Sequence, residues 1–346
     1  MIWLTWRQFR AQAVTTIMVL AAFAVLLAVT RPHVTSLYAT SGIAGCHGDR
    51  CEQLANTFLG LVNTGIYPLV FTLGVVGIVA APAVIGIFWG APLIAREFET
   101  GTFRMAWTQS ITRTRWLASK LALPGLAAMA VTEALSLMYG WWAAPIGQAA
   151  RFATEPSFPL GMSPFSLPAF DAHGIAPLGY AAFAFTLGVT TGVLLRRALL
   201  AMAVTLAIFA VVQVVVPLGI RPHLFPPDHT TAAIFDFSGG TSVSPGSFAF
   251  AVEHLRDKPG VWILSSGAVD AAGQPVSAIP AACRRDSTGG APDIGSCLAS
   301  QGIRVAVTYQ PTSRYWPIQL IETAIYLALA VALGGFCLWR LGRRLP

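Results

Sequence analysis

Six long apolar stretches, separated by polar connectors, constrain the fold of this chain more than any other feature. They span residues 11–30, 66–95, 121–146, 175–195, 198–219 and 317–339. Each is long enough to cross about 30 Å of hydrocarbon as a helix that rises about 1.5 Å per residue. Charged residues make up only 11% of the chain, against roughly 25% in a soluble domain. We therefore expect an all-α polytopic membrane protein with six transmembrane helices.

A short amphipathic segment precedes the first apolar stretch. Residues 1–10, MIWLTWRQFR, mix three aromatic side chains with Arg7 and Arg10. At helical spacing this pattern is typical of a cytoplasmic interfacial helix, with its aromatic rings among the lipid headgroups. A plain positive flank of the first span explains it equally well. The first span is longer than the apolar core of a signal peptide and no A-x-A cleavage site follows it, so we expect it to be retained.

The one long polar region, residues 220–316, follows residues 11–219, which we assign to the first five spans and their connectors. Residues 303–309, IRVAVTY, alternate apolar and other side chains with the period of a strand, and the compact apolar run at 261–265 is a second candidate. We expect a partly β, extracytoplasmic domain at 220–316. Residues 317–346 should then form the sixth span and a basic cytoplasmic tail.

The five cysteines fall into a pattern that predicts disulfides. Cys46 and Cys51 lie in the first connector, Cys283 and Cys297 in the last, and Cys337 within an apolar stretch. Two pairs in connectors indicate two disulfides if these connectors face an oxidising compartment. Four cysteines allow three pairings, of which the local one is the simplest. We expect Cys46–Cys51 and Cys283–Cys297 bridges, the second of them within the β domain.

Basic residues are distributed unevenly over the two faces that six spans define. With both termini inside, the cytoplasmic segments hold 12 of the 22 Lys and Arg residues: Arg7, Arg10, Arg96, Arg104, Arg113, Arg115, Lys120, Arg196, Arg197, Arg340, Arg343 and Arg344. The other ten are spread over a far longer stretch of chain. The positive-inside rule therefore predicts cytoplasmic termini, and it explains the net charge of +7 without a nucleic-acid partner. It also places the four connector cysteines outside.

One short connector, residues 96–120, carries an unusual share of charge between two spans. Its sequence is REFETGTFRMAWTQSITRTRWLASK. Gly101 should end the preceding helix, because glycine readily adopts the left-handed conformation of a helix end. Phe103, Trp107 and Ile111 recur every four residues and give one apolar face, which predicts a short amphipathic helix. This helix either anchors the connector at the membrane surface or contacts a partner.

Motifs for catalysis and nucleotide binding are missing from the sequence. Neither of the two lysines follows a glycine, so there is no P-loop. There is also no H-E-x-x-H or G-x-S-x-G motif. We expect no catalytic residue, metal or cofactor on this chain. Asp171-x-His173 is a weak indication of a metal or proton-relay site, and the tripeptide Arg-Pro-His, at 31–33 and 221–223, indicates a shared way of ending a helix.

Two acidic residues within the spans are candidates for the translocation path. Glu133 follows Lys120 by 13 residues, which places it about 20 Å deep at about 1.5 Å per residue. A charge at that depth costs on the order of 3 kcal/mol. It either lines a substrate route or is hydrogen-bonded by neighbouring helices. Glu322 lies nearer the outer end of its span, where a charge costs less free energy than at the depth of Glu133.

The motifs of the 96–120 connector carry a resemblance. Arg-Glu-x-Glu-Thr-Gly-Thr at 96–102, Trp-Thr-Gln-Ser at 107–110 and Thr-Arg-x-Arg-Trp-Leu at 112–117 resemble the permease subunits of ABC-2-type exporters, in the form common in actinobacteria. The resemblance extends to the stretches at 171–197 and 221–227, so it covers most of the chain. It implies a multi-pass protein of the bacterial cell membrane that forms the translocation path as a homodimer with a second copy of itself.

The resemblance also implies how such a chain is driven. Two copies of a separate P-loop ATPase subunit would bind ATP and Mg, so this chain itself is not expected to be an enzyme. The loop after the second span would be the coupling helix that contacts the ATPase. The residues that match it are Glu97, Glu99, Gly101, Thr102, Phe103, Arg104 and Trp107.

Two other classes of function remain as alternatives. A membrane-anchored sensor or binding protein would act through its extracytoplasmic domain. A proton-coupled transporter would use Glu133, but no clear inverted repeat or second mid-membrane charge supports it. A gene for a P-loop ATPase beside this one would favour the exporter. The sequence does not identify the transported substrate.

Overall fold

Six long helices form the body of the protein. The computed structural model describes residues 2–47, 50–101, 113–153, 165–232, 237–238, 241–244, 247–250, 254–255, 260–283 and 294–344. Within these ranges, six stretches are long and apolar enough to cross a membrane: Gln12–Ser41, Tyr67–Thr100, Thr114–Ala150, Ala176–Leu195, Ala198–His223 and Thr312–Arg340. The predicted helical, multi-pass fold is confirmed.

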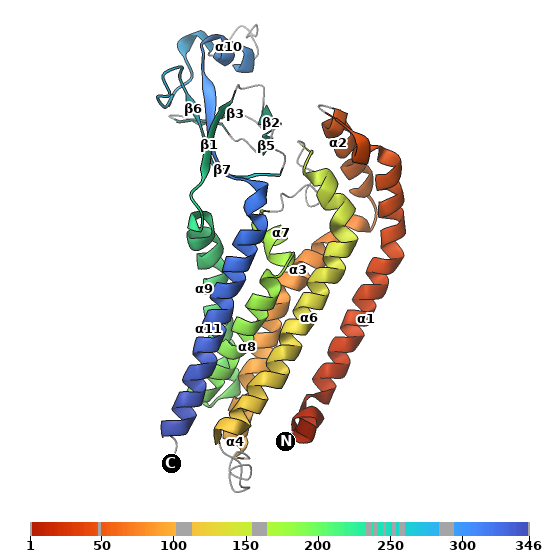
Figure 1. Cartoon of the computed structure of the whole chain (residues 1–346), viewed down its shortest axis with the longest axis vertical. Helices are drawn as coiled ribbons and strands as arrows, with labels where there is room; N and C mark the ends of the chain where they lie inside the picture. Colours follow the sequence, from red (N-terminus) through yellow and green to blue (C-terminus); the bar gives the residue numbers. More distant parts are fainter. Residues whose placement is uncertain are drawn as a thin grey trace.

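Both chain ends lie at one end of the bundle, and the strands lie at the other (Figure 1). We call these the terminal end and the domain end. The helices are α1 (Ile2–Ser41), α2 (Arg50–Val62), α3 (Tyr67–Ile85), α4 (Ala91–Thr100), α6 (Arg113–Ala150), α7 (Leu167–Ala172), α8 (Ala176–Leu195), α9 (Ala198–Val215), α10 (Ile294–Ser300) and α11 (Tyr315–Arg344). Two π-helical turns, η2 (Gly86–Gly90) and η3 (Val216–Ile220), follow α3 and α9.

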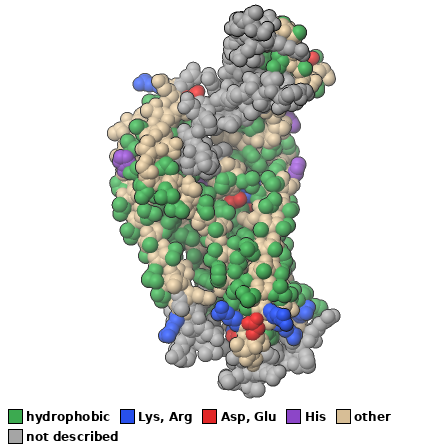
Figure 2. Space-filling view, turned by 180° about the vertical axis from the view of Figure 1, so that it is seen from behind, with side chains coloured by type: hydrophobic (Ala, Val, Ile, Leu, Met, Phe, Trp, Pro, Cys, Tyr) green, Lys and Arg blue, Asp and Glu red, His purple; other side chains and the backbone are tan. Residues whose placement is uncertain are grey.

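The middle of the bundle exposes a broad apolar surface. Figure 2 shows apolar side chains over the middle of one face, with Lys and Arg gathered near the terminal end. Large apolar side chains such as Val29 and Val331 are 73% and 75% exposed. A protein in water rarely exposes so much contiguous apolar surface, whereas hydrocarbon accepts it. The distribution fits the six spans identified from length and composition.

α1 is longer than the first apolar stretch. It contains nearly all of the expected interfacial segment at 1–10, and it continues to Ser41, well past residue 30, where the first apolar stretch ends. The ring of Tyr38 meets Phe58 of α2 edge-on, with centroids 5.6 Å apart. Packing against α2 stabilises the helix beyond the point where the hydropathy falls. Residues 2–10 are therefore continuous with the first span, and their position at a membrane surface stays a prediction.

α8 lies at the centre of the bundle and is the most buried of the six spans. Its glycines let the second span approach closely. A Cβ at Gly192 would lie 2.6 Å from the carbonyl oxygen of Ala91, and one at Gly90 would lie 2.5 Å from that of Phe185. Any larger residue would force the two helices apart, so backbone-to-backbone packing fixes the second span against α8.

The second span is irregular at η2. Pro82 lies within the second span, where a proline is expected to kink a helix. The helix nevertheless passes through it and loses regular α-geometry only at the π-turn, where the Gly86 N–H donates to the carbonyls of both Pro82 and Ala83. Proline removes one backbone donor, and a π-turn is one way to accommodate the loss. The span therefore has a built-in irregularity between α3 and α4.

The strands lie between α9 and α11 in the chain. They are β1 (Asp228–Ala232), β2 (Phe237–Ser238), β3 (Thr241–Ser244), β4 (Ser247–Phe250), β5 (His254–Leu255), β6 (Trp262–Val269) and β7 (Arg304–Gln310). An antiparallel sheet has the order β1-β7-β6, and β2–β5 and β3–β4 form separate pairs. The two predicted strands correspond to β7 and the start of β6. Val305, Val307 and Tyr309 of β7 are buried, as the alternation predicts.

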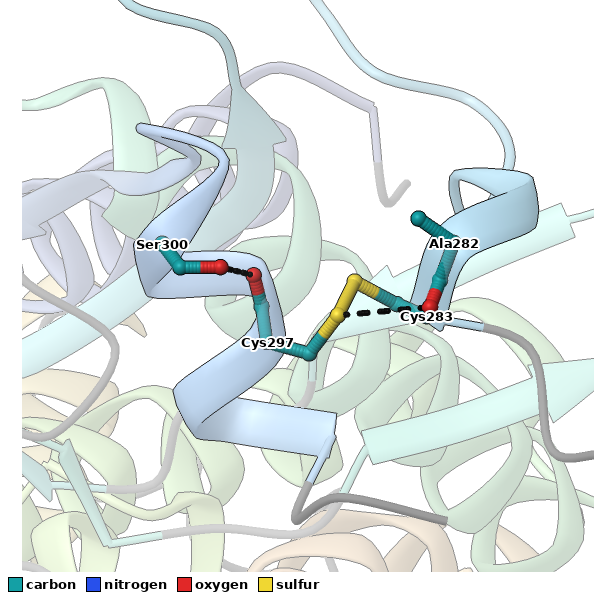
Figure 3. The surroundings of a disulfide bond; sticks show 4 residues. All are labelled: Ala282, Cys283, Cys297 and Ser300. Atoms are coloured by element: carbon teal, nitrogen blue, oxygen red, sulfur yellow. Dashed lines mark hydrogen bonds between the residues drawn. A yellow bond between two sulfur atoms is a disulfide. The ribbon is translucent and has the colours of Figure 1, made fainter.

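Four cysteines lie at disulfide distance in the predicted local pairs. The sulfur atoms of Cys46 and Cys51 are 2.07 Å apart, and those of Cys283 and Cys297 are 1.95 Å apart. Figure 3 shows the second pair, which joins a 3-10 turn to α10. Cys337 is a buried free thiol in α11. Whether the β region lies outside the cytoplasm stays a prediction.

Candidate functional site

A buried ionic cluster lies at the domain end of the bundle, around Arg221. Its Nε donates to Glu322 Oε2 at 2.7 Å and its Nη2 donates to Glu322 Oε1 at 2.8 Å. The same Nη2 forms a short ion pair with Asp171 Oδ1. Arg221 is 1% exposed and Glu322 is 0% exposed. Charges buried to this degree are costly unless they are paired and hydrogen-bonded, and here they are both.

Two aromatic side chains complete the cluster. The Tyr180 hydroxyl lies 2.6 Å from Glu322 Oε1 and 3.1 Å from Asp171 Oδ1, so it can donate to either carboxylate. The guanidinium of Arg221 lies over the ring of Phe170, 4.0 Å from its centroid. Burial raises the pKa of Asp171, and the charge of Arg221 opposes that rise. Because two carboxylates share one guanidinium, Asp171 is the group best placed to take up a proton.

The cluster joins four elements that are distant in the sequence. Asp171 comes from α7, Tyr180 from α8, Arg221 from the end of the fifth span just after η3, and Glu322 from α11. One turn before Glu322, Gln319 accepts from the Ala176 N–H at 2.9 Å and donates to the carbonyl of His173 at 3.0 Å. The sixth span is thereby fastened to both the start of α8 and the end of the fifth span.

Sequence reasoning identified Glu322 alone among these residues as a candidate. The sequence suggested Asp171 only as half of an acid–histidine pair with His173. In the structure the two side chains have different partners. Asp171 binds Arg221, whereas His173 Nδ1 lies 2.7 Å from the carbonyl oxygen of Ala169. The signal that points to Arg221 is the repeated Arg-Pro-His. In its other copy, Arg31 also lies over an aromatic ring, 3.8 Å from the centroid of Trp141.

The charged connector is fastened to the bundle at the terminal end. Lys120 of α6 forms a short ion pair with Glu97 of α4, and both side chains are largely buried. Glu99 Oε1 accepts from the backbone N–H of Ala198, the first residue of α9, at 2.8 Å. Because Arg197 supplies no side-chain cap, Glu99 provides the acceptor that the start of α9 lacks. The second span therefore contacts the third and the fifth through these two carboxylates.

Part of the connector can be compared with its prediction. Gly101 ends α4 in the left-handed conformation, with φ 71°, as predicted. Thr102, Phe103, Arg104 and Trp107 lie outside the described residues, and so does most of the amphipathic helix expected there. The roles of these residues and of Glu97 and Glu99 toward a partner stay predictions.

A hollow opens beside this connector at the terminal end. It has a volume of about 720 Å³ and its lining includes Arg96, Glu99, Arg197 and Leu199. Leu199 is 83% exposed. An exposed leucine between charged side chains is a combination that a protein partner can use.

Glu133 lies in α6, away from both ends of the span. Its Oε2 is buried and has no hydrogen-bond partner among the described residues. Neighbouring hydroxyls do not satisfy it, since Thr132 Oγ1 donates to the carbonyl of Ala128 at 3.0 Å and Ser136 Oγ donates to that of Gly174 at 3.0 Å. Thr132 and Ser136 lie on the same helix as Glu133, and whether this acid serves the translocation path or the fold stays a prediction.

The described part of the chain contains no group of three or more His, Cys, Asp or Glu residues that could hold a metal ion. Six apolar spans, with a charged connector between the second and third, define a multi-pass membrane protein. Residues 17–221 match the family described as ABC-2 membrane transporter related. This match covers more than half of the chain, which therefore belongs to that family. Comparisons with curated proteins and with solved structures gave no match.

Proposed function

We propose that this chain is the membrane-spanning permease subunit of an ATP-driven exporter. Two copies would form the translocation path in a bacterial cell membrane, with both termini in the cytoplasm. Two separate P-loop ATPase subunits would bind ATP and Mg and would contact the terminal end through the 96–120 connector. The family match and the six spans support the permease, and the distribution of basic residues supports the orientation.

The attachment of the connector carries this proposal. A partner that moves residues 96–110 would act directly on α4, and Glu99 would transmit that displacement to the start of α9 through its hydrogen bond to Ala198. The ion pair of Glu97 with Lys120 would include α6 in the same movement. One contact surface would thus reach three of the six spans.

The two ends of the fifth span favour a hinged movement of that span. Its terminal end is held by Glu99, and its domain end is held by the buried Arg221. Between them, η3 interrupts regular α-geometry. Irregular turns of this kind are frequent at functional sites and give a helix a place to bend.

Co-purification with the ATPase encoded beside this chain tests the proposal. We expect a complex of two permease and two ATPase chains, resolved by native mass spectrometry. Leu199→Glu should weaken that complex, because it places a charge on the exposed leucine of the hollow. Leu61→Glu is the matched control, since this leucine is 55% exposed on α2 at the domain end. Failure of every neighbouring P-loop ATPase to bind the unaltered chain contradicts the proposal.

The alternative of a membrane-anchored sensor is less well supported. Its working part would be the β region, which lies beyond the matched residues 17–221. A sensor of this kind would not explain the charged connector and its contacts at the terminal end. We therefore retain the exporter as the proposed function.

A further inference from the structure

A cavity of about 340 Å³ lies at the domain end, between the end of α6, α7 and the start of α11. Its buried lining includes Phe71, Ile146 and Ala169, which are 5%, 0% and 4% exposed. These side chains form an apolar floor. The volume falls at the small end of the range found for pockets that hold small molecules, about 300–1,000 Å³.

The exposed lining residues form the mouth of this cavity. Gln148 lies in the last turn of α6, Arg151 directly follows that helix, and both are exposed. Trp316 of α11 is 57% exposed. These residues stand at the ends of the third and sixth spans, so the mouth lies at the level where a membrane meets water. Tryptophan and arginine are among the side chains that anchor helices at that level. Gly260, beside β6, adjoins the mouth, because a Cβ there would lie 3.5 Å from Arg151 Cγ.

The charged group in the described lining of the cavity is basic. Arg151 brings a guanidinium that forms no ion pair among the described residues, and Gln148 adds an amide. No Asp or Glu belongs to the lining within the described part of the chain. His173 contributes no charge at neutral pH, because burial lowers its pKa. The positive charge is therefore confined to the mouth, above an apolar floor.

We propose that this cavity binds an amphipathic anion, with the apolar part on the Phe71–Ile146 floor and the anionic group at Arg151. A molecule of this kind already sits in a membrane with its charged group at the level of the mouth. A free single-chain acid and the head of an anionic phospholipid both have this chemistry. The site goes beyond the proposed function, because binding requires no ATPase.

Equilibrium binding of radiolabelled palmitate to the full chain, purified alone in a neutral detergent, tests the site. We expect saturable binding of one palmitate per chain, and at least tenfold weaker binding of hexadecanol, its neutral counterpart. Arg151→Gln should weaken palmitate at least tenfold and leave hexadecanol unchanged. Arg151→Lys should retain most of the affinity, and Arg304→Gln, which removes an exposed arginine of β7 outside the cavity, should retain all of it.

A second variant tests the floor independently of charge. Gly140 lines the cavity, and a Cβ there has room, since its nearest neighbour is His173 Cδ2 at 3.9 Å. Gly140→Leu should fill the space and abolish binding of both ligands. Gly77→Leu is the control, because Gly77 lies on α3 with nothing within 4 Å of its Cβ and does not line the cavity. Thermal unfolding verifies that each variant is folded.

Competition by phosphatidylglycerol in nanodiscs distinguishes the two sources. If phosphatidylglycerol displaces palmitate from the unaltered chain but not from Arg151→Gln, the phospholipid is an occupant of the cavity. If palmitate binds and phosphatidylglycerol does not displace it, the occupant is a free single-chain acid. Equal affinity for palmitate and hexadecanol overturns the proposal. So does a folded Gly140→Leu variant that binds like the unaltered chain, or the absence of any saturable binding.

Discussion

Arg221 binds both carboxylate oxygens of Glu322, through hydrogen bonds of 2.7 Å from Nε and 2.8 Å from Nη2, 101 residues apart in the sequence. This pairing joins the end of the fifth span to the sixth. A planar guanidinium fits a carboxylate in this two-point geometry, whereas a lysine offers a single point charge. The domain end of the bundle therefore depends on one arginine for the contact between these two spans.

Arg221→Met should destabilise the protein by about 3–5 kcal/mol, because it leaves Glu322 and Asp171 buried without a counter-charge. Arg221→Lys should restore only part of this loss. Thermal unfolding in detergent measures both. The control is Asp228→Asn, which weakens the more exposed pair with Arg314 and should cost about 0–1 kcal/mol. Equal effects of the two substitutions would contradict a special role for the buried pair.

Asp171 should make stability depend on pH. Burial raises its pKa above the ordinary value of 3.8 in the folded protein, against the charge of Arg221. A raised folded pKa means that the contribution of Asp171 to stability is fully present below its unfolded pKa and is lost as the pH rises through the folded pKa. Asp171→Asn keeps an oxygen acceptor for Arg221 and cannot titrate.

The melting temperature of the unaltered chain, relative to Asp171→Asn, should therefore fall as the pH rises from the ordinary value of 3.8 through the higher pKa of the folded protein. Thermal unfolding of both proteins over that range measures the difference. Asp228→Asn, outside the cluster, serves as the control for general acid effects. A difference that rises with pH contradicts the assignment, because it would require a lowered pKa.

Much of this architecture follows from the sequence, and the parts that do not are those that depend on distant residues. Hydropathy locates the spans, and the alternation at 303–309 locates β7. α1 extends to Ser41 because it packs against α2, which hydropathy cannot reveal. Arg221 and Asp171 are 50 residues apart, so no local pattern predicts their pairing.

The same limit applies to the charged connector. The sequence assigns Glu97 and Glu99 to partner docking, because no local pattern pairs Glu97 with Lys120, 23 residues further on, or Glu99 with the start of α9, 99 residues further on. The structure gives both carboxylates partners within the chain. Gly101 differs, since a glycine after a helical run is itself the signal of a helix end.

Glu99→Ala and Glu99→Gln separate two roles for this acid. If Glu99 acts as the acceptor for the Ala198 N–H, glutamine should preserve coupling and alanine should lose it, with a cost of about 1 kcal/mol at the helix start. If its charge binds a partner, both substitutions should be equally harmful. Coupling is measured as the difference in ATP hydrolysis between the ATPase subunits alone and the ATPase subunits reconstituted with each variant of this chain. We expect the glutamine variant to keep it.

The four connector cysteines test both the bridges and the orientation. Peptide mapping without reductant should recover the Cys46–Cys51 and Cys283–Cys297 pairs, with Cys337 as a thiol. After reduction of whole cells, a membrane-impermeant maleimide should label the four cysteines of the two pairs. Labelling that requires permeabilised cells would place the domain end in the cytoplasm and would contradict the proposed topology.

Glu133 separates stability from transport. Its unpaired buried oxygen costs free energy, since a buried polar group without a hydrogen bond loses about 1–3 kcal/mol. Glu133→Leu should therefore leave the melting temperature unchanged or raise it. If the acid lines the translocation path, the same variant should lose export while still binding the ATPase.

Glu133→Gln provides the second measurement, because it keeps the shape of the side chain and removes its charge. Loss of export in both variants assigns the role to the charge, and loss in the leucine variant alone assigns it to hydrogen bonding. Thr132→Val is the control on the same helix, since its hydroxyl bonds only to carbonyls of its own turn. A lower melting temperature for Glu133→Leu, with export preserved, would show that this acid serves the fold. The melting temperature and the export rate of these variants together decide whether Glu133 serves the fold or transport.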